Sequence, residues 1–205
     1  MSVADASARA RRFDALYRDA IDPWNFRGSS YEREKYRATL AALPRPRYRR
    51  ALEIGCSIGE LSSLLRGRAD EVLGLDVSTV AIDEARRAHG DTAGLHFETG
   101  EVPRDWPPGT FDLVVLSEVL YFLAPDEIGA LAAHVVAALE PGGDCVAVCW
   151  LGDTDGERDL DGDEAARCFA NALLDGITGT NALRKRSSYR EPCYRLDVFA
   201  RVASR

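Results

Sequence analysis

The sequence predicts an α/β protein with a doubly wound, mostly parallel sheet that carries helices on both faces. The first observation is an alternation, in which five short apolar segments are separated by stretches with helical periodicity. The second is that some of these segments, such as 113–116 (Leu-Val-Val-Leu), are apolar without interruption, as in strands buried on both faces. The strands expected in this part are 50–55, 71–76, 94–99, 111–117 and 144–150.

Two helices are expected before the first of these strands. Apolar residues at helical spacing predict an amphipathic helix over 8–20 and a second helix over 31–43. Pro23 ends the first helix and Pro44 ends the second, because the residue before a proline disfavours the helical conformation.

The rest of the chain continues the alternation and then departs from it. Helices are expected between the strands at 59–67, 78–89 and 126–139. The acidic stretch 151–164 predicts a loop, and a helix is expected over 163–175. The segments 183–191 and 194–202 predict two strands joined around Pro192, which would add a hairpin to the edge of the sheet.

The composition is that of one soluble, core-forming domain. Of the 205 residues 46% are apolar and 29% charged, which excludes disorder and coiled coil for the chain as a whole. We expect a single domain over 1–205, with a helical cap over 1–48 and a core over 49–205. No apolar run approaches the roughly 18 residues of a membrane span, and the N-terminus lacks the apolar stretch of a secretory signal. We therefore expect a cytoplasmic protein without a membrane partner.

The charge is negative and unevenly distributed. The formal net charge of -7 argues against a nucleic-acid partner, since phosphate binding requires a basic surface. Residues 1–50 hold 12 of the 26 basic and 6 of the 33 acidic residues, which leaves 14 and 27 for the remainder. A basic cap on an acidic body would produce this count, and so would Arg-rich helices exposed to solvent.

No metal site is expected. The five cysteines are odd in number and lack a C-x-x-C spacing, so reduced thiols are favoured over a zinc site or disulfides. An EF-hand in the acidic loop is excluded, because the register with Gly162 at the sixth position puts Cys168 at the twelfth, where a glutamate is required.

The most informative segment joins the first strand of the alternation to the next helix and reads Glu53-Ile-Gly55-Cys56-Ser57-Ile-Gly59-Glu60. Glycines allow the backbone to approach a ligand, and a helix N-terminus supplies free N–H donors. A dinucleotide site requires G-x-G-x-x-G, but Ser57 and Glu60 stand at the second and third glycine positions, and a carboxylate repels a pyrophosphate. The loop therefore favours a ligand with a positive charge and no phosphate. The same residues argue against a nucleotide-sugar dehydrogenase.

The run E-x-G-x-S-x-G at 53–59 resembles the first motif of the class I S-adenosylmethionine (SAM) dependent methyltransferases. Asp76, which ends the second strand, stands where this family holds both ribose hydroxyls, and Glu101-Val102-Pro103 stand where it contacts the adenine. The stretches 107–123 and 139–143 resemble the fourth motif and the turn into the fifth strand. The resemblance implies SAM as cofactor, S-adenosylhomocysteine (SAH) as product, and seven strands in the order 3-2-1-4-5-7-6 with the last one antiparallel.

A closer resemblance covers most of the chain. The segments 22–44, 51–65 and 193–201 are similar to the nodulation protein S family, which N-methylates a free amino sugar of a chitin-type oligosaccharide. Members of that family tend to carry a histidine beside the tryptophan after the fifth strand, and another in a G-D-x-x-H stretch. This chain has Cys149 beside Trp150 and reads Gly-Asp-Glu-Ala-Ala at 162–166. A different acceptor or a different base is therefore implied.

The resemblance and the position of each residue define a set of candidate site residues. The cofactor candidates are Trp24, Tyr31, Glu53, Gly55, Cys56, Ser57, Gly59, Asp76, Val77, Glu101, Val102 and Ser117. Glu118 and Tyr121 follow the fourth strand and are the catalytic candidates, Glu118 for orienting or deprotonating the acceptor.

Structural roles compete with several of these assignments. Asp76 would also serve to cap the helix that starts near residue 78, and Glu101 would also suit a solvated loop. Tyr121 could equally pack in the core, and Trp24 and Tyr31 could equally be anchors for the N-terminal helices or a lid over the cofactor.

We expect a SAM-dependent methyltransferase whose partner is a small-molecule or saccharide acceptor, with an amine nitrogen as the methylated atom. An O-methyltransferase of secondary metabolism and a non-catalytic SAM-binding regulatory protein are the alternatives. The sequence leaves the oligomeric state open.

Overall fold

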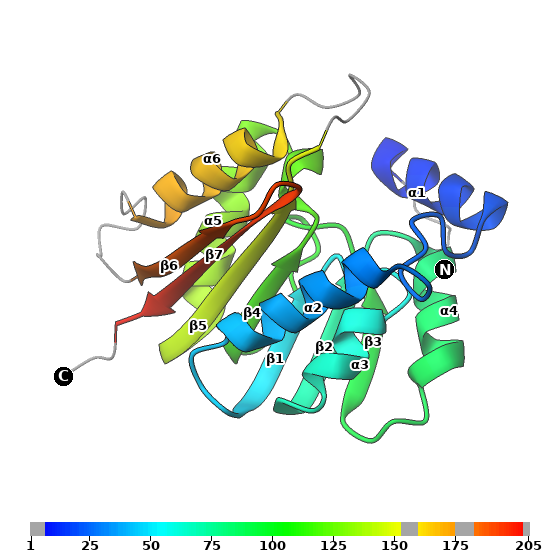
Figure 1. The fold of residues 1–205 in the computed structure, drawn as a ribbon, viewed down its shortest axis with the longest axis horizontal. Coiled ribbons are helices and arrows are strands. Elements are labelled where there is room, and N and C mark those ends of the chain that lie inside the picture. Colours follow the sequence, from blue (N-terminus) through cyan, green and yellow to red (C-terminus); the bar gives the residue numbers. More distant parts are fainter. Residues whose placement is uncertain (1–6, 153–159, 175–182, 203–205) are drawn as a thin grey trace.

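The computed structural model describes residues 7–152, 160–174 and 183–202. Within these residues the chain forms a seven-stranded sheet in the order β3-β2-β1-β4-β5-β7-β6 (Figure 1). All neighbouring strands are parallel except that β7 runs antiparallel to both β5 and β6. The strands are β1 (Tyr48–Ile54), β2 (Ala69–Asp76), β3 (Leu95–Thr99), β4 (Phe111–Ser117), β5 (Leu139–Trp150), β6 (Leu183–Arg190) and β7 (Tyr194–Arg201). The predicted fold class and strand order are confirmed.

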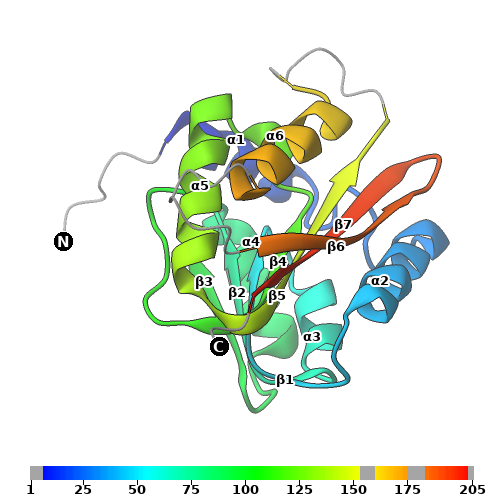
Figure 2. The same cartoon turned by 90° about the vertical axis from the view of Figure 1, so that its left-hand side faces the viewer.

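Helices cover both faces of the sheet, as the sequence predicts (Figures 1 and 2). The α-helices are α1 (Ala8–Asp19), α2 (Ser30–Ala42), α3 (Glu60–Leu65), α4 (Thr79–His89), α5 (Pro125–Ala138) and α6 (Gly162–Leu174). Side chains of α2, α3 and α4 form the core on one face, and side chains of α5 and α6 form it on the other. Helix α1 packs on α4. In the described part of the chain, no helix is both long and apolar enough to cross a membrane.

Strand β4 is buried on both faces, as its uninterrupted apolar run predicts. Leu113, Val114, Val115 and Leu116 are all fully buried. Because successive side chains of a strand point to opposite faces, Val114 and Leu116 join the core beneath α5 and α6, while Leu113 and Val115 join the core beneath α2, α3 and α4.

Two elements differ from the expectation. Strand β5 begins at Leu139, five residues before the predicted 144, because Leu139 pairs with Phe111 of β4. The register of this pair of strands is irregular beyond that point, and Gly142 accommodates the irregularity with a φ of 78°. A short 3₁₀ helix, η1 (Leu120–Phe122), follows β4 and was not expected. The part of the acidic loop at 153–159 lies outside the described residues.

A buried polar cluster attaches the start of β1 to the middle of the sheet. The hydroxyl of Tyr48 donates to Asp144 Oδ2 at 2.9 Å, and Asp144 is fully buried. Asp112 of β4 accepts the backbone N–H groups of Arg49 and Arg50 at 2.8–3.1 Å. These contacts hold β1 beside β4 and so position the loop that follows β1.

Replacing Tyr48 by Phe should lower the free energy of unfolding by about 1–3 kcal/mol, because Asp144 stays buried and loses a donor. Urea unfolding measures this change. Tyr189→Phe is the control, since Tyr189 is 52% exposed on β6 and its variant should match the wild type. Equal stability of the two variants would contradict the role assigned to the buried cluster.

Candidate functional site

A cavity of about 750 Å³ lies at the carboxyl ends of the central strands. In a doubly wound sheet, the carboxyl ends of the parallel strands form a crevice at the point where the strand order reverses, which here lies between β1 and β4. The sheet side of the cavity includes Ile54, Gly55, Ser57, Leu75, Asp76, Val77, Gly100, Glu101, Val102, Ser117, Glu118, Val119, Tyr121 and Trp150. The opposite wall comes from the N-terminal segment and includes Arg9, Phe13, Leu16, Tyr17, Pro23, Trp24, Phe26, Ser29, Tyr31, Glu32 and Lys35.

The glycine loop after β1 uses its two glycines differently. Gly55 has a φ of 80° and lines the cavity, and a Cβ there would collide with the carbonyl oxygen of Ser117 at the end of β4. Gly59 has a φ of 87° and begins α3, where a Cβ would collide with the ring of Phe97. Only the first glycine therefore brings backbone to the cavity.

Asp76 both lines the cavity and holds the surrounding loops. Its Oδ2 accepts the backbone N–H of Ser57 and its Oδ1 that of Ser78, each at 2.9 Å. Burial raises the pKa of Asp76, although these N–H donors oppose the shift. The second bond links Asp76 to Ser78, which is itself the N-cap of α4 and accepts the Ala81 N–H, so Asp76 supports the helix start without capping it.

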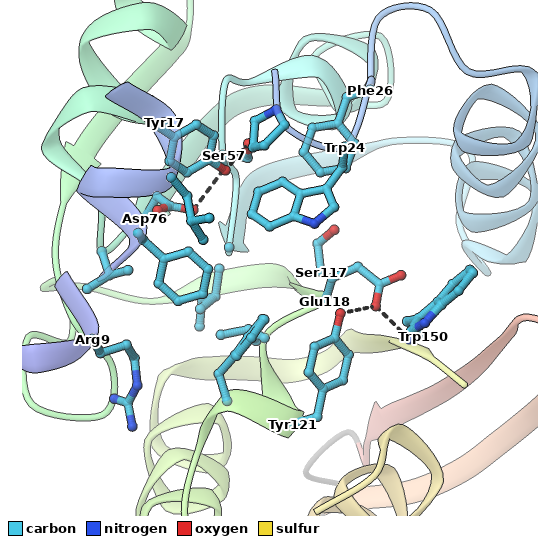
Figure 3. Close-up of a pocket in the computed structure, with 18 of the residues that line it drawn as sticks. Arg9, Tyr17, Trp24, Phe26, Ser57, Asp76, Ser117, Glu118, Tyr121 and Trp150 are labelled. Atoms are coloured by element: carbon cyan, nitrogen blue, oxygen red, sulfur yellow. Dashed lines mark hydrogen bonds between the residues drawn. The ribbon is translucent and has the colours of Figure 1, made fainter. Parts of the chain in front are cut away.

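Helix α1 closes one side of the cavity through side chains that the sequence analysis did not single out. The hydroxyl groups of Tyr17 and Ser57 lie 2.5 Å apart, next to Asp76 (Figure 3). Arg9 donates to Glu101 Oε1 at 2.8 Å. Arg9, Phe13 and Tyr17 are spaced by four residues, so they share one helix face, and this spacing could have identified them.

The two catalytic candidates are in contact at the other side of the cavity. Glu118 has a φ of 57°, an unfavourable backbone conformation for this residue type. Its Oε2 accepts the Tyr121 hydroxyl at 2.8 Å and the Trp150 backbone N–H at 2.6 Å (Figure 3). Its Oε1 accepts Lys35 Nζ at 2.7 Å. Lys35 was not predicted, and it is 83 residues away in the sequence.

The aromatic candidates Trp24 and Tyr31 both line the cavity but contact different neighbours. Trp24 packs against Tyr17 with ring centroids 5.6 Å apart. Tyr31 packs edge-on against Trp150, also at 5.6 Å. The Tyr31 hydroxyl is buried and has no hydrogen-bond partner among the described residues. Burial, followed by the nearby charge of Glu118, raises the pKa of this hydroxyl.

Three cofactor candidates do not line the cavity. Glu53 lies beneath the glycine loop, where its Oε2 accepts the Ser62 hydroxyl at 2.5 Å. Cys56 is buried, which raises the pKa of its thiol, and Gly59 faces Phe97. A contact of these three residues with a cofactor stays a prediction, and in the structure they shape the loop. Glu60 is also occupied, since it pairs with Arg27 at 2.9 Å.

The histidines do not contribute to the cavity lining. His134 of α5 stacks on Trp106, and His89 of α4 packs on Phe97, while His96 lies in β3. Within residues 7–152, 160–174 and 183–202, no group of three or more His, Cys, Asp or Glu side chains is placed to hold a metal ion. The polar side chains that line the cavity around Glu118 include carboxylates, an ammonium and hydroxyls.

Comparison with known proteins agrees with this geometry. Residues 51–143 match the family model of a methyltransferase domain, a range that contains the glycine loop, Asp76, Glu101 and Glu118. A crystal structure of a Pseudomonas syringae protein described as a methyltransferase is 36% identical, covering 84% of this chain and 100% of that chain, with a TM-score of 0.67. The chain belongs to the class I SAM-dependent methyltransferases.

Within this methyltransferase family the chain is also similar to nodulation protein S. The protein of that name from Rhizobium tropici is 31% identical over 129 residues, which are 62% of this chain and 54% of the relative. The chain spans between 54% and 66% of the three such relatives. The N-methyltransferase NodS of Bradyrhizobium japonicum, solved with SAH, shares the fold at 20% identity, with a TM-score of 0.72 and coverage of 96% of this chain and 99% of that one.

The buried carboxyl of Glu53 should make stability depend on pH. Burial raises its pKa to about 8, so the folded protein keeps this proton at pH values where an unfolded glutamate, at about 4.3, has lost it. Between these values the folded state binds more protons, and the free energy of unfolding falls as the pH rises, by at most about 1.4 kcal/mol per unit.

Glu53→Gln removes this contribution. The free energy of unfolding of the variant, relative to that of the wild type, should therefore increase as the pH is raised from 5 to 8. Urea unfolding at four pH values measures the difference. Glu98→Gln serves as the control, because Glu98 is exposed on β3. A Glu53→Gln profile parallel to that of the wild type would refute the assignment.

Proposed function

We propose that this protein binds SAM in the cavity and transfers its methyl group to an amine nitrogen of a small molecule, such as an amino sugar or a glycoconjugate. The observation that carries the proposal is the cavity itself. It joins the glycine loop and Asp76 at one side to the carboxylates of Glu118 and Glu32 at the other. A cytoplasmic location and a single domain over 1–205 stay predictions from the sequence.

The residues of the first side fit the cofactor. The buried carboxylate of Asp76 has no ion pair among the described residues, so the hydroxyls of a ribose are suitable donors to it. Glu101 Oε2 is buried without a hydrogen bond from a described residue, and an adenine amino group would supply one. Gly55 and Ser57 present backbone to the cavity, with Val77, Val102 and Ser117 also among the lining. When bound, SAM supplies a methyl group on a sulfonium, which is a strong leaving group.

The second side suits a cationic acceptor. Glu32, Glu118 and Lys35 together carry one net negative charge, and all three line the cavity. This charge favours an ammonium over an anion. The protein then has two tasks, to align the nitrogen and to remove its proton. Alignment in favourable cases accounts for about 7–11 kcal/mol of a barrier.

One comparison favours a second candidate function. The ubiquinone biosynthesis O-methyltransferase of Burkholderia orbicola is 36% identical over 100 residues, which are 46% of this chain and 41% of that protein. Transfer to a hydroxyl of a small molecule is therefore the alternative reaction. A SAM-binding protein without catalysis is the third possibility, and turnover tests it directly.

Replacing Asp76 by Ala should weaken SAH binding about 10- to 100-fold, because charge-assisted hydrogen bonds of about 1.5–3 kcal/mol each are lost. Calorimetry with SAM, SAH and NAD measures this, and NAD should not bind. Asp70→Ala is the matched control, since Asp70 lies on the same strand but its side chain is 57% exposed and pairs with Arg47. Unchanged SAH affinity in the Asp76 variant would exclude the cavity as the cofactor site.

An acceptor panel should separate the candidate reactions. SAH release is followed with D-glucosamine, chitosan oligomers and benzylamine as amines, and with catechols as hydroxyl acceptors, each at pH 6 and pH 8.5. Amine methylation should rise with pH, because only the neutral amine carries a free lone pair. Turnover of catechols alone would favour the O-methyltransferase, and SAH binding without any turnover would favour the regulatory protein.

A further inference from the structure

Glu32 is a buried carboxylate whose side-chain contact among the described residues is with Lys35. The sequence Ser29-x-x-Glu32 at the start of α2 fits a capping box, in which Glu32 would bind back to the N-cap N–H. In the structure Ser29 does cap the helix, accepting the Glu32 backbone N–H at 3.2 Å, but the Glu32 side chain turns to Lys35. Glu32 is 7% exposed and lines the cavity.

One oxygen of Glu32 is available to accept a proton. Lys35 Nζ donates to Oε1 at 3.1 Å. Oε2 lies 3.0 Å from the same nitrogen but receives no hydrogen bond from the described residues, although it is buried. A buried carboxylate oxygen with an open lone pair on the wall of a cavity is suited to a donor on a bound molecule.

Glu118 differs from Glu32 in this respect. Both of its oxygens already accept hydrogen bonds. Oε1 accepts Lys35, and Oε2 accepts Tyr121 and the Trp150 backbone (Figure 3). Three donors occupy most of the acceptor capacity of Glu118, which keeps one open lone pair on Oε1, whereas Glu32 Oε2 receives no hydrogen bond from a described residue. It is therefore better suited to hold Lys35, which lies between the two carboxylates, than to remove a proton.

Burial, more than any neighbouring charge, sets the direction of the pKa shift of Glu32. Burial raises the pKa of Glu32, and the carboxylates of Glu118 and Asp22 act in the same direction, while Lys35 on its own helix opposes them. The Tyr31 and Tyr36 hydroxyls also lie within the influence of the Glu32 charge and have raised pKa values themselves, so they remain protonated. A base whose pKa is raised toward the working pH is more effective.

We propose that Glu32 is the residue that takes the proton from the acceptor amine, and that Lys35 is the positioning residue that holds its carboxylate at the cavity wall. This proposal rests on the proposed amine methylation. An N–H bond of the bound ammonium breaks, the proton bonds to Glu32 Oε2, and the electron pair stays on nitrogen as the lone pair that attacks the methyl carbon. The positive charge of the ammonium and the negative charge of Glu32 are thereby both neutralised, and the proton is later released to water.

The test compares Glu32→Gln with Glu34→Gln, since Glu34 is exposed on the same helix two residues away. The first amine turned over in the acceptor panel is assayed from pH 5.5 to 9. We expect kcat/KM of Glu32→Gln to fall about 100- to 10,000-fold, the range of general base catalysis, with SAH affinity within twofold of the wild type. Formate should partly restore turnover in Glu32→Ala. Glu34→Gln should behave as the wild type.

A second measurement does not depend on turnover. In protein with ¹³C-labelled glutamate carboxyls, the signal that Glu32→Gln removes should titrate with a midpoint above the ordinary value of about 4.3. A midpoint at or below that value would contradict the proposed environment of Glu32. Thermal unfolding of each variant shows whether a loss of activity reflects a loss of structure.

The possible outcomes separate this inference from the proposed function. If the wild type binds SAH but methylates no amine, the proposed function fails. If the wild type methylates an amine and Glu32→Gln retains at least a third of its kcat/KM with the same pH profile, only the role of Glu32 is refuted. A folded Glu32→Gln protein with normal SAH affinity, little turnover and rescue of Glu32→Ala by formate supports the role.

Discussion

The close approach of the Gly55 backbone to the Ser117 carbonyl determines where the site lies. Gly55 directly follows β1 and Ser117 ends β4. The strand order reverses at this central pair, so a crevice opens beyond the carboxyl ends of the two strands. No side chain fits between them, which is why the loop needs a glycine with a positive φ at this point. Asp76 lies beside this contact on β2, and Glu118 comes directly after Ser117. Both sides of the cavity therefore depend on the contact between Gly55 and Ser117.

The uneven charge of the chain has a structural cause. Basic residues of the N-terminal segment pair with acidic residues of the rest of the protein, as Arg27 does with Glu84 and Lys35 with Glu118. Helix α1 is attached in the same way through Arg9 and Glu101. A basic segment on an acidic body therefore describes these residues better than helices solvated on all sides. The pairs bring α1 and α2 over the cavity, where their side chains form its second wall.

The two positions at which nodulation protein S relatives tend to carry histidines have packing roles in this chain. Cys149 is fully buried in β5. Asp163 at the start of α6 pairs with Arg190 and Arg195 and so joins this helix to the hairpin of β6 and β7, while Ala166 packs in the core. The carboxylates Glu32 and Glu118 line the cavity, and burial is one way to raise the pKa of a carboxyl toward the range of a useful base near neutral pH.

The sequence by itself determined the α/β class, the position of nearly every helix and strand, and the glycine loop with Asp76, because these depend on the periodicity and residue types of short segments. It did not reveal the early start of β5, which depends on pairing with Phe111. Only the tertiary structure decided which charged groups meet. Lys35 reaches Glu118 across 83 residues and Arg9 reaches Glu101 across 92, and no local pattern encodes such pairs. The difference between Glu32 and Glu118 is also decided by the tertiary structure, because the number of hydrogen-bond donors around each carboxylate depends on how distant segments pack.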